Sequence, residues 1–135
     1  MTSTNPYNKP EFIERVRKLP RYEQLYALGA LVTERYNQVY KGVGSVVVGG
    51  LSAAYHSNSQ YLTDDIDLVV LDDEIYTQVM QELGFTKGNH LAYASRYWIY
   101  EELNIFVEAP GSNFDTVDLT RLIKQTILGH TLYVQ

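Results

Sequence analysis

The most constraining feature of the sequence is a β-branched apolar run that ends in a pair of glycines. The run Ser45–Val48 is followed at once by Gly49 and Gly50. Such a short run flanked by glycines is typical of a buried strand rather than a helix. Glycines allow the backbone to turn sharply and to approach a ligand closely. A short helix predicted over Leu51–Ser57 would direct unpaired N–H groups and the Ser52 hydroxyl at that turn, so the segment predicts an anion site.

A second strand, predicted over Ile66–Leu71, has paired aspartates at its start. Asp65 and Asp67 are two residues apart, and because strand side chains alternate, we expect both carboxylates on one face of the sheet. A divalent cation relieves the repulsion between two such charges. The chain has no cysteine, and oxygen ligands favour Mg²⁺ or Mn²⁺ over zinc.

Each of these two motifs also has a simpler interpretation. A glycine pair by itself is a plain turn, and alternating aspartates by themselves form a solvated strand face. Their succession along the chain favours the functional interpretation over the simpler one, because a phosphate-binding turn beside a metal site is what phosphoryl transfer requires.

The rest of the chain alternates helical and extended patterns. Its 135 residues are enough for one domain with a buried core. Residues 1–10 are expected to be a loose lead-in. Helices are predicted over 10–19, Arg21–Tyr40, Asp72–Leu83 and Asp115–Leu128, and strands over Leu91–Tyr100 and Leu103–Glu108, with a tail or short edge strand over Thr131–Gln135. The order predicts an α/β (α+β) fold, with a small mixed β-sheet flanked by helices.

The charge balance and the absence of long apolar runs exclude several classes of protein. The net charge is −5, with 11 basic against 16 acidic residues, which disfavours a general nucleic-acid binder. No apolar run approaches the ~18 residues of a membrane span. The amino-terminal residues lack a basic start and an apolar stretch, so no signal peptide is predicted. The expected location is cytoplasmic.

The two motifs resemble the nucleotidyltransferase superfamily of the DNA polymerase β type. The resemblance is carried by Val48-Gly49-Gly50-Leu51-Ser52-Ala53 and by Thr63-Asp64-Asp65-Ile66-Asp67-Leu68. It is nearest to small bacterial members, among them components of toxin–antitoxin systems, and continues weakly to about residue 112. It implies a minimal nucleotidyltransferase fold in a single domain over 1–135, without the helical carboxy-terminal domain of larger relatives.

The resemblance also implies a reaction and the residues that perform it. Members of the superfamily transfer a nucleoside monophosphate from a nucleoside triphosphate such as ATP to a hydroxyl acceptor, using Mg²⁺ or Mn²⁺. By resemblance, Gly49, Gly50 and Ser52 would hold the triphosphate of the nucleotide. Asp65 and Asp67 would bind the metal ions.

A third carboxylate on a neighbouring strand completes the metal site in the family. Glu108 is the candidate here, because a charge at the end of an apolar strand is unexpected without a partner. Asn104 is an alternative equivalent position, and in that case the third ligand is missing and catalysis is in doubt. Glu102 is a further alternative.

Arg96 is a candidate for binding the nucleotide. It precedes Tyr97 and Trp98, and an arginine can pair with a phosphate while an aromatic ring stacks on a base. The simpler interpretation is a surface arginine beside a core tryptophan. The acidic charge disfavours RNA as the acceptor, and the resemblance implies a partner protein, toxin or antitoxin. The alternative function is a catalytically degenerate module that binds nucleotide or protein.

Overall fold

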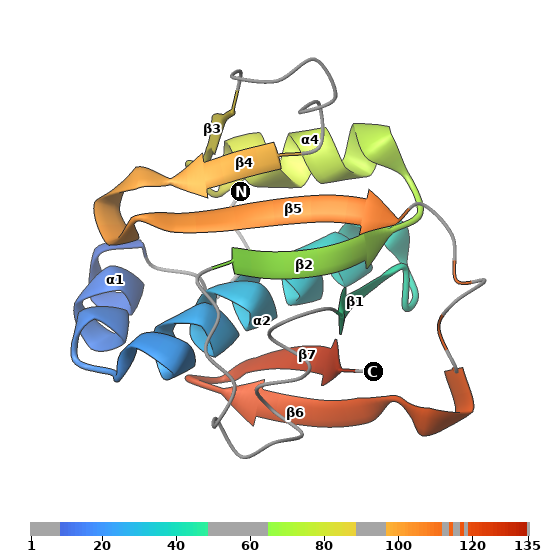
Figure 1. Cartoon of the computed structure of the whole chain (residues 1–135), viewed down its shortest axis with the longest axis horizontal. Coiled ribbons are helices and arrows are strands. Elements are labelled where there is room, and N and C mark those ends of the chain that lie inside the picture. Colours follow the sequence, from blue (N-terminus) through green and yellow to red (C-terminus); the bar gives the residue numbers. More distant parts are fainter. Residues whose placement is uncertain are drawn as a thin grey trace, which may run out of the picture.

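A computed structural model of the chain describes residues 9–48, 65–88, 97–111, 114, 117 and 119–134. The helices are α1 (Lys9–Arg17), α2 (Arg21–Tyr40) and α4 (Asp73–Glu82), with 3-10 turns η2 (Glu101–Leu103) and η3 (Leu119–Arg121). The strands are β1 (Ser45–Val48), β2 (Asp65–Val70), β3 (Thr86–Lys87), β4 (Tyr97–Tyr100), β5 (Ile105–Gly111), β6 (Ile123–Ile127) and β7 (His130–Val134). The predicted mixed α/β class is confirmed (Figure 1).

The strands form one mixed sheet with β2 at its centre. The order is β3-β4-β5-β2-β1-β7-β6. β2 pairs in parallel with β5 and antiparallel with β1. β1 continues in parallel to β7, which forms an antiparallel hairpin with β6. The two strands that carry the sequence motifs are therefore interior neighbours.

The core lies between the sheet and the three helices, which pack on one of its faces (Figure 1). Strand β2 contributes Ile66, Leu68 and Val70, all fully buried, to this core. Because side chains alternate along a strand, the aspartates of β2 emerge on the opposite face. A smaller cluster of Val46, Val69 and Val117 covers part of that second face.

The end of α2 is held by one side chain. Asn37 Oδ1 accepts hydrogen bonds from the backbone N–H groups of Gly44 (2.8 Å) and Ser45 (2.9 Å). The αL residue that ends the helix is Lys41, at φ 66°, and not one of the glycines that follow it. Asn37 thus fixes where β1 begins relative to α2.

The predicted carboxy-terminal helix over Asp115–Leu128 is wrong. Within the described residues, this part of the chain contains η3 followed by the β6–β7 hairpin. The hairpin turn uses Leu128 (φ 50°) and Gly129 (φ 83°), and two successive positive φ values are the geometry of a tight hairpin turn. Apolar residues around Leu122 and Ile127 imitate a helical spacing, but β-branched residues at Ile123, Thr126 and Ile127 favour a strand.

Other boundaries differ by smaller amounts. Helix α1 begins at Lys9, inside the predicted lead-in, and β5 begins at Ile105, after the predicted start, and runs beyond the predicted end to Gly111. The predicted tail or edge strand is β7, which lies inside the sheet between β1 and β6. The helix predicted over Leu51–Ser57 and the first part of the strand predicted from Leu91 lie outside the described residues.

None of the helices in the described ranges combines the length and the apolar character needed to cross a membrane.

The contact between Gly44 and the tyrosines of α2 predicts a specific loss of stability. Tyr36 and Tyr40 stack with ring centroids 5.8 Å apart, and a Cβ on Gly44 would lie 2.7 Å from Tyr40 Cγ and 2.8 Å from Tyr36 Cε1. We expect Gly44→Ala to lower the free energy of unfolding by about 1–3 kcal/mol, because the stacked rings leave little room to shift. Urea denaturation measures it.

Gly42→Ala is the matched control, because its Cβ would come no closer than 3.8 Å to Tyr40. Equal stability of the two variants would contradict the packing explanation.

Candidate functional site

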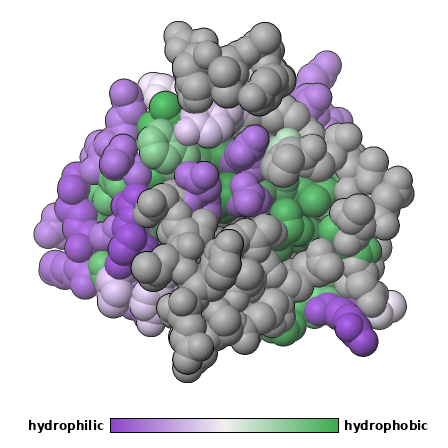
Figure 2. Space-filling view, viewed as in Figure 1, coloured by the Kyte–Doolittle hydropathy of each residue, from purple (hydrophilic) through white to green (hydrophobic). Residues whose placement is uncertain are grey.

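The two aspartates lie at the start of β2 on the face of the sheet opposite the described helices α1, α2 and α4. Asp65 is exposed and Asp67 is half-buried, whereas Ile66 and Leu68 between and beyond them are buried. This is the alternation predicted from the sequence. In Figure 2, which looks onto this face, hydrophilic side chains gather near the centre, over β2 and β5.

Glu108 lies directly beside Asp67. The parallel pairing of β2 with β5 sets Asp67 opposite Glu108 in the register, and neighbouring strands are ~4.8 Å apart. On its other side, Glu108 is opposite Tyr97 of β4. Asp67, Glu108 and Tyr97 therefore form a row across three strands, and Asp65 lies one pleat away on the same face.

The two alternatives to Glu108 lie elsewhere. Asn104 occupies an αL turn (φ 52°) just before β5, where its carbonyl oxygen accepts a hydrogen bond of 2.6 Å from Arg21. Glu102 is in η2 and forms an exposed ion pair of 3.8 Å with Arg17. Of the three candidates, Glu108 is the one that the fold brings next to the aspartates.

The pairing of β2 with β5 becomes irregular just beyond this row. Asp67 pairs with Glu108, but Val69 pairs with Gly111, so β5 has an extra residue between them. Pro110 lies in this stretch, and proline has no N–H to donate to a neighbouring strand. Glu108 is thus next to the point where regular pairing ends, as is common for strand residues at functional sites.

The strand that precedes the glycine pair of the motif ends at the same row. Val48, the last residue of β1, is opposite Asp67, and Gly49 is the next residue along the chain. Gly49, Gly50, Ser52 and Arg96 lie outside the described residues, so their predicted roles in binding the triphosphate stay predictions.

Tyr97 is the functional candidate that the sequence reasoning did not separate from its neighbours. Its ring stacks on Phe106, with centroids 5.8 Å apart and an interplanar angle of 21°. Phe106 is opposite Asp65 in the register. Burial, followed by the negative charges of Asp65 and Glu108, raises the pKa of the Tyr97 hydroxyl above its usual value. Its alternation with the buried Trp98 along the strand was the available signal.

Trp98 is not available to stack on a base. Its side chain is 2% exposed, on the helix-covered face, and it makes an edge-on contact with Tyr76 at 6.4 Å between ring centroids. The interpretation of this residue as a core tryptophan is confirmed.

The oxygen donors of the site suit a hard divalent cation. Asp67 and Glu108 offer carboxylates side by side, and Mg²⁺ is commonly held by one or two carboxylates together with water and substrate phosphates. Within the described ranges, there is no group of three or more His, Cys, Asp or Glu side chains placed to hold a metal ion. The fit is therefore to a two-carboxylate site that a phosphate would complete.

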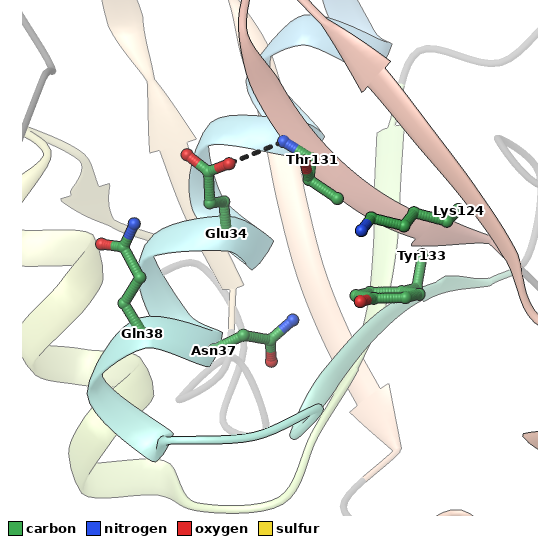
Figure 3. Close-up of a pocket in the computed structure, with 6 residues that line it drawn as sticks. All are labelled: Glu34, Asn37, Gln38, Lys124, Thr131 and Tyr133. Carbon is green, nitrogen blue, oxygen red and sulfur yellow. Dashed lines mark hydrogen bonds between the residues drawn. The ribbon is translucent and has the colours of Figure 1, made fainter.

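A pocket of about 310 Å³ lies elsewhere, between α2 and the β6–β7 hairpin (Figure 3). It is lined by Glu34, Asn37, Gln38, Lys124, Thr131 and Tyr133. Its inner polar groups already serve the fold. Glu34 accepts a hydrogen bond of 2.8 Å from the Thr131 N–H and contacts His130 Nδ1 at 2.8 Å, while Asn37 holds the start of β1. These contacts hold α2 against the β6–β7 hairpin and the start of β1. We therefore assign the pocket a structural role and not the role of the candidate site.

The chain matches no family model, and searches of the curated proteins and of the solved structures found no match either.

The charges around Tyr97 predict a measurable change in its titration. Removing the Glu108 charge with Glu108→Gln should lower the pKa of the Tyr97 hydroxyl, and Asp65→Asn should lower it further, because Asp65 is the stronger of the two electrostatic causes. NMR titration of ¹³C-labelled tyrosines measures this, with Tyr97→Phe assigning the resonance. An unchanged pKa in both variants would show that the hydroxyl is remote from the carboxylates.

The Glu34 contacts predict that the packing of α2 against the β6–β7 hairpin contributes measurably to the free energy of unfolding. Glu34→Ala leaves the buried His130 and the Thr131 N–H without their shared partner, so we expect a loss of about 1–3 kcal/mol in the free energy of unfolding. Gln38→Ala, an exposed position on the same helix, should change it by less than about 0.5 kcal/mol. Chemical denaturation of both variants checks this, and similar losses would refute the assignment.

Proposed function

We propose that the protein is a metal-dependent nucleotidyltransferase that moves a nucleoside monophosphate from a nucleoside triphosphate to a hydroxyl acceptor. The observation that carries the proposal is the pairing of Asp67 with Glu108 on the face opposite the described helices, with Val48, the last residue of β1, on the other side of Asp67. Two carboxylates would supply a place for a cation, and the glycine turn predicted after Val48 would supply a place for phosphates, which are the two requirements of the reaction.

The described residues include side chains suited to binding the cation and to accepting a proton, as this reaction requires. Asp67 and Glu108 would offer two carboxylates to the cation from neighbouring strands, and Asp65 lies two residues before Asp67 on the same face. When bound, Mg²⁺ or Mn²⁺ would neutralise the charge of the triphosphate and of the attacking oxygen. Glu108 is in register with both Asp67 and Tyr97, and in this proposal its carboxylate accepts the proton of an acceptor hydroxyl.

The acceptor that we propose is a protein or small-molecule hydroxyl. With a net charge of −5, the chain lacks the excess of basic residues that typically neutralises the phosphates of an RNA strand. A partner protein of a toxin–antitoxin pair is the acceptor that the family resemblance suggests.

A second candidate function is nucleotide binding without turnover. It is favoured by the described part of the chain containing no three-residue metal site. Under this alternative, a nucleoside triphosphate with Mg²⁺ raises the melting temperature, but no pyrophosphate is released with any acceptor. Under the proposed function, both signals appear.

The decisive variant is Asp67→Asn, which removes one charge of the pair and keeps the size of the side chain. We expect it to lower transfer of labelled nucleotide to protein hydroxyls by on the order of 100-fold or more, as loss of a main electrostatic contributor does elsewhere. The assay uses ATP, CTP, GTP and UTP in turn with Mg²⁺ and a bacterial lysate as the source of acceptors.

Glu101→Gln is the matched control, because Glu101 is exposed in η2 and belongs to no proposed site. It should transfer label at the wild-type rate. Equal labelling by wild type and Asp67→Asn would refute the proposed function.

A further inference from the structure

The position of Tyr97 suggests an acceptor within the chain itself. Tyr97 is the third member of the row that begins with Asp67 and Glu108, on the same face of the sheet. A hydroxyl beside the proton-accepting carboxylate of a transferase is where its acceptor belongs. We propose that Tyr97 is a self-modification site, whose hydroxyl receives a nucleoside monophosphate from the bound triphosphate; this inference rests on the proposed function.

The ring of Tyr97 is held in one orientation by its neighbours. Phe106 stacks on it with centroids 5.8 Å apart. On the other side, Gly88 donates its backbone N–H to the Tyr97 carbonyl oxygen at 2.8 Å, and a Cβ on Gly88 would collide with the Tyr97 ring. A ring fixed between neighbours presents its hydroxyl with little loss of conformational freedom, which favours reaction in place.

The stack brings the Tyr97 ring beside the residue of β5 that is opposite Asp65. Phe106 pairs with Asp65 in the register, so Tyr97 and the aspartates lie on the same face of the sheet with one strand between them. Tyr97 is half-buried, so part of its side chain is accessible from solvent.

The step balances without any further reactant. The Tyr97 hydroxyl oxygen forms a bond to the α-phosphorus of the triphosphate, and the bond from that phosphorus to the bridging oxygen breaks. Pyrophosphate leaves with the electron pair of the broken bond. The hydroxyl proton passes to the Glu108 carboxylate and then to solvent.

Modification of Tyr97 would prevent a second modification of the same chain. A phosphodiester on Tyr97 adds a negative charge next to Asp65 and Glu108, and it occupies the space of a second acceptor hydroxyl. We therefore expect one modification per chain. Because donor site and acceptor lie on one sheet, the modified fraction should grow at a rate independent of protein concentration.

The test is mass spectrometry of the intact chain and of its peptides after incubation with each of ATP, CTP, GTP and UTP and Mg²⁺. Wild type should gain one nucleoside monophosphate, less one water, on Tyr97. Tyr97→Phe keeps the aromatic stack and removes the acceptor oxygen, so it should lose at least ten-fold of the modification. Tyr22→Phe, at an exposed tyrosine of α2, should be modified like wild type.

A second measurement does not depend on turnover. The α,β-methylene analogue of ATP cannot release pyrophosphate, and with Mg²⁺ it should shift the ¹³C resonance of Tyr97 more than that of Tyr22. An unshifted Tyr97 resonance at saturating analogue would overturn the placement of its hydroxyl at the donor site.

The outcomes separate this inference from the function on which it rests. Transfer of label to an added acceptor with Tyr97 unmodified overturns the inference and keeps the proposed function. Modification at another residue, or equal modification of Tyr97→Phe, also overturns it. No pyrophosphate release and no modification with any of the four nucleotides overturns both.

Discussion

The central constraint of this structure is the burial of one face of β2. Ile66, Leu68 and Val70 are fully buried under the helices, and the alternation of a strand then obliges Asp65 and Asp67 to face the other way. A slip of one residue in the register would bury two carboxylates and expose three apolar side chains. The same burial that stabilises the core therefore sets the position of the acidic row.

That row becomes a potential site because β2 is the central strand. It has β5 on one side and β1 on the other, so Glu108 of β5 and Val48, the last residue of β1, both come next to Asp67. Neither neighbour is adjacent to Asp67 in sequence. The aromatic pair Tyr97 and Phe106 extends the row toward the edge of the sheet, and it gives the site an apolar wall beside its charged centre.

The remainder of the fold supports this centre through a few polar contacts. Asn37 ties the end of α2 to the start of β1, and Glu34 ties the middle of the same helix to the β6–β7 hairpin. Arg21, at the start of α2, holds the carbonyl oxygens of Leu103 and Asn104 before β5, at 2.7 and 2.6 Å. One helix thus fixes the positions of β1, β5 and β7, three of the strands that surround or support the acidic row.

Local patterns were sufficient for the amino-terminal helices, β1, β2 and α4, because apolar periodicity acts within a few positions. They also determined that both aspartates of β2 share a face.

The carboxy-terminal hairpin was mistaken for a helix, since its apolar spacing fits both a helix and a strand and only pairing with β1 decides between them. Which acidic residue joins the aspartates was likewise decided by tertiary structure: Glu108, Asn104 and Glu102 are near one another in sequence, but the parallel register of β2 with β5 places Glu108 alone among them beside Asp67. Register depends on contacts between distant segments, and a single sequence does not encode those contacts in any local pattern.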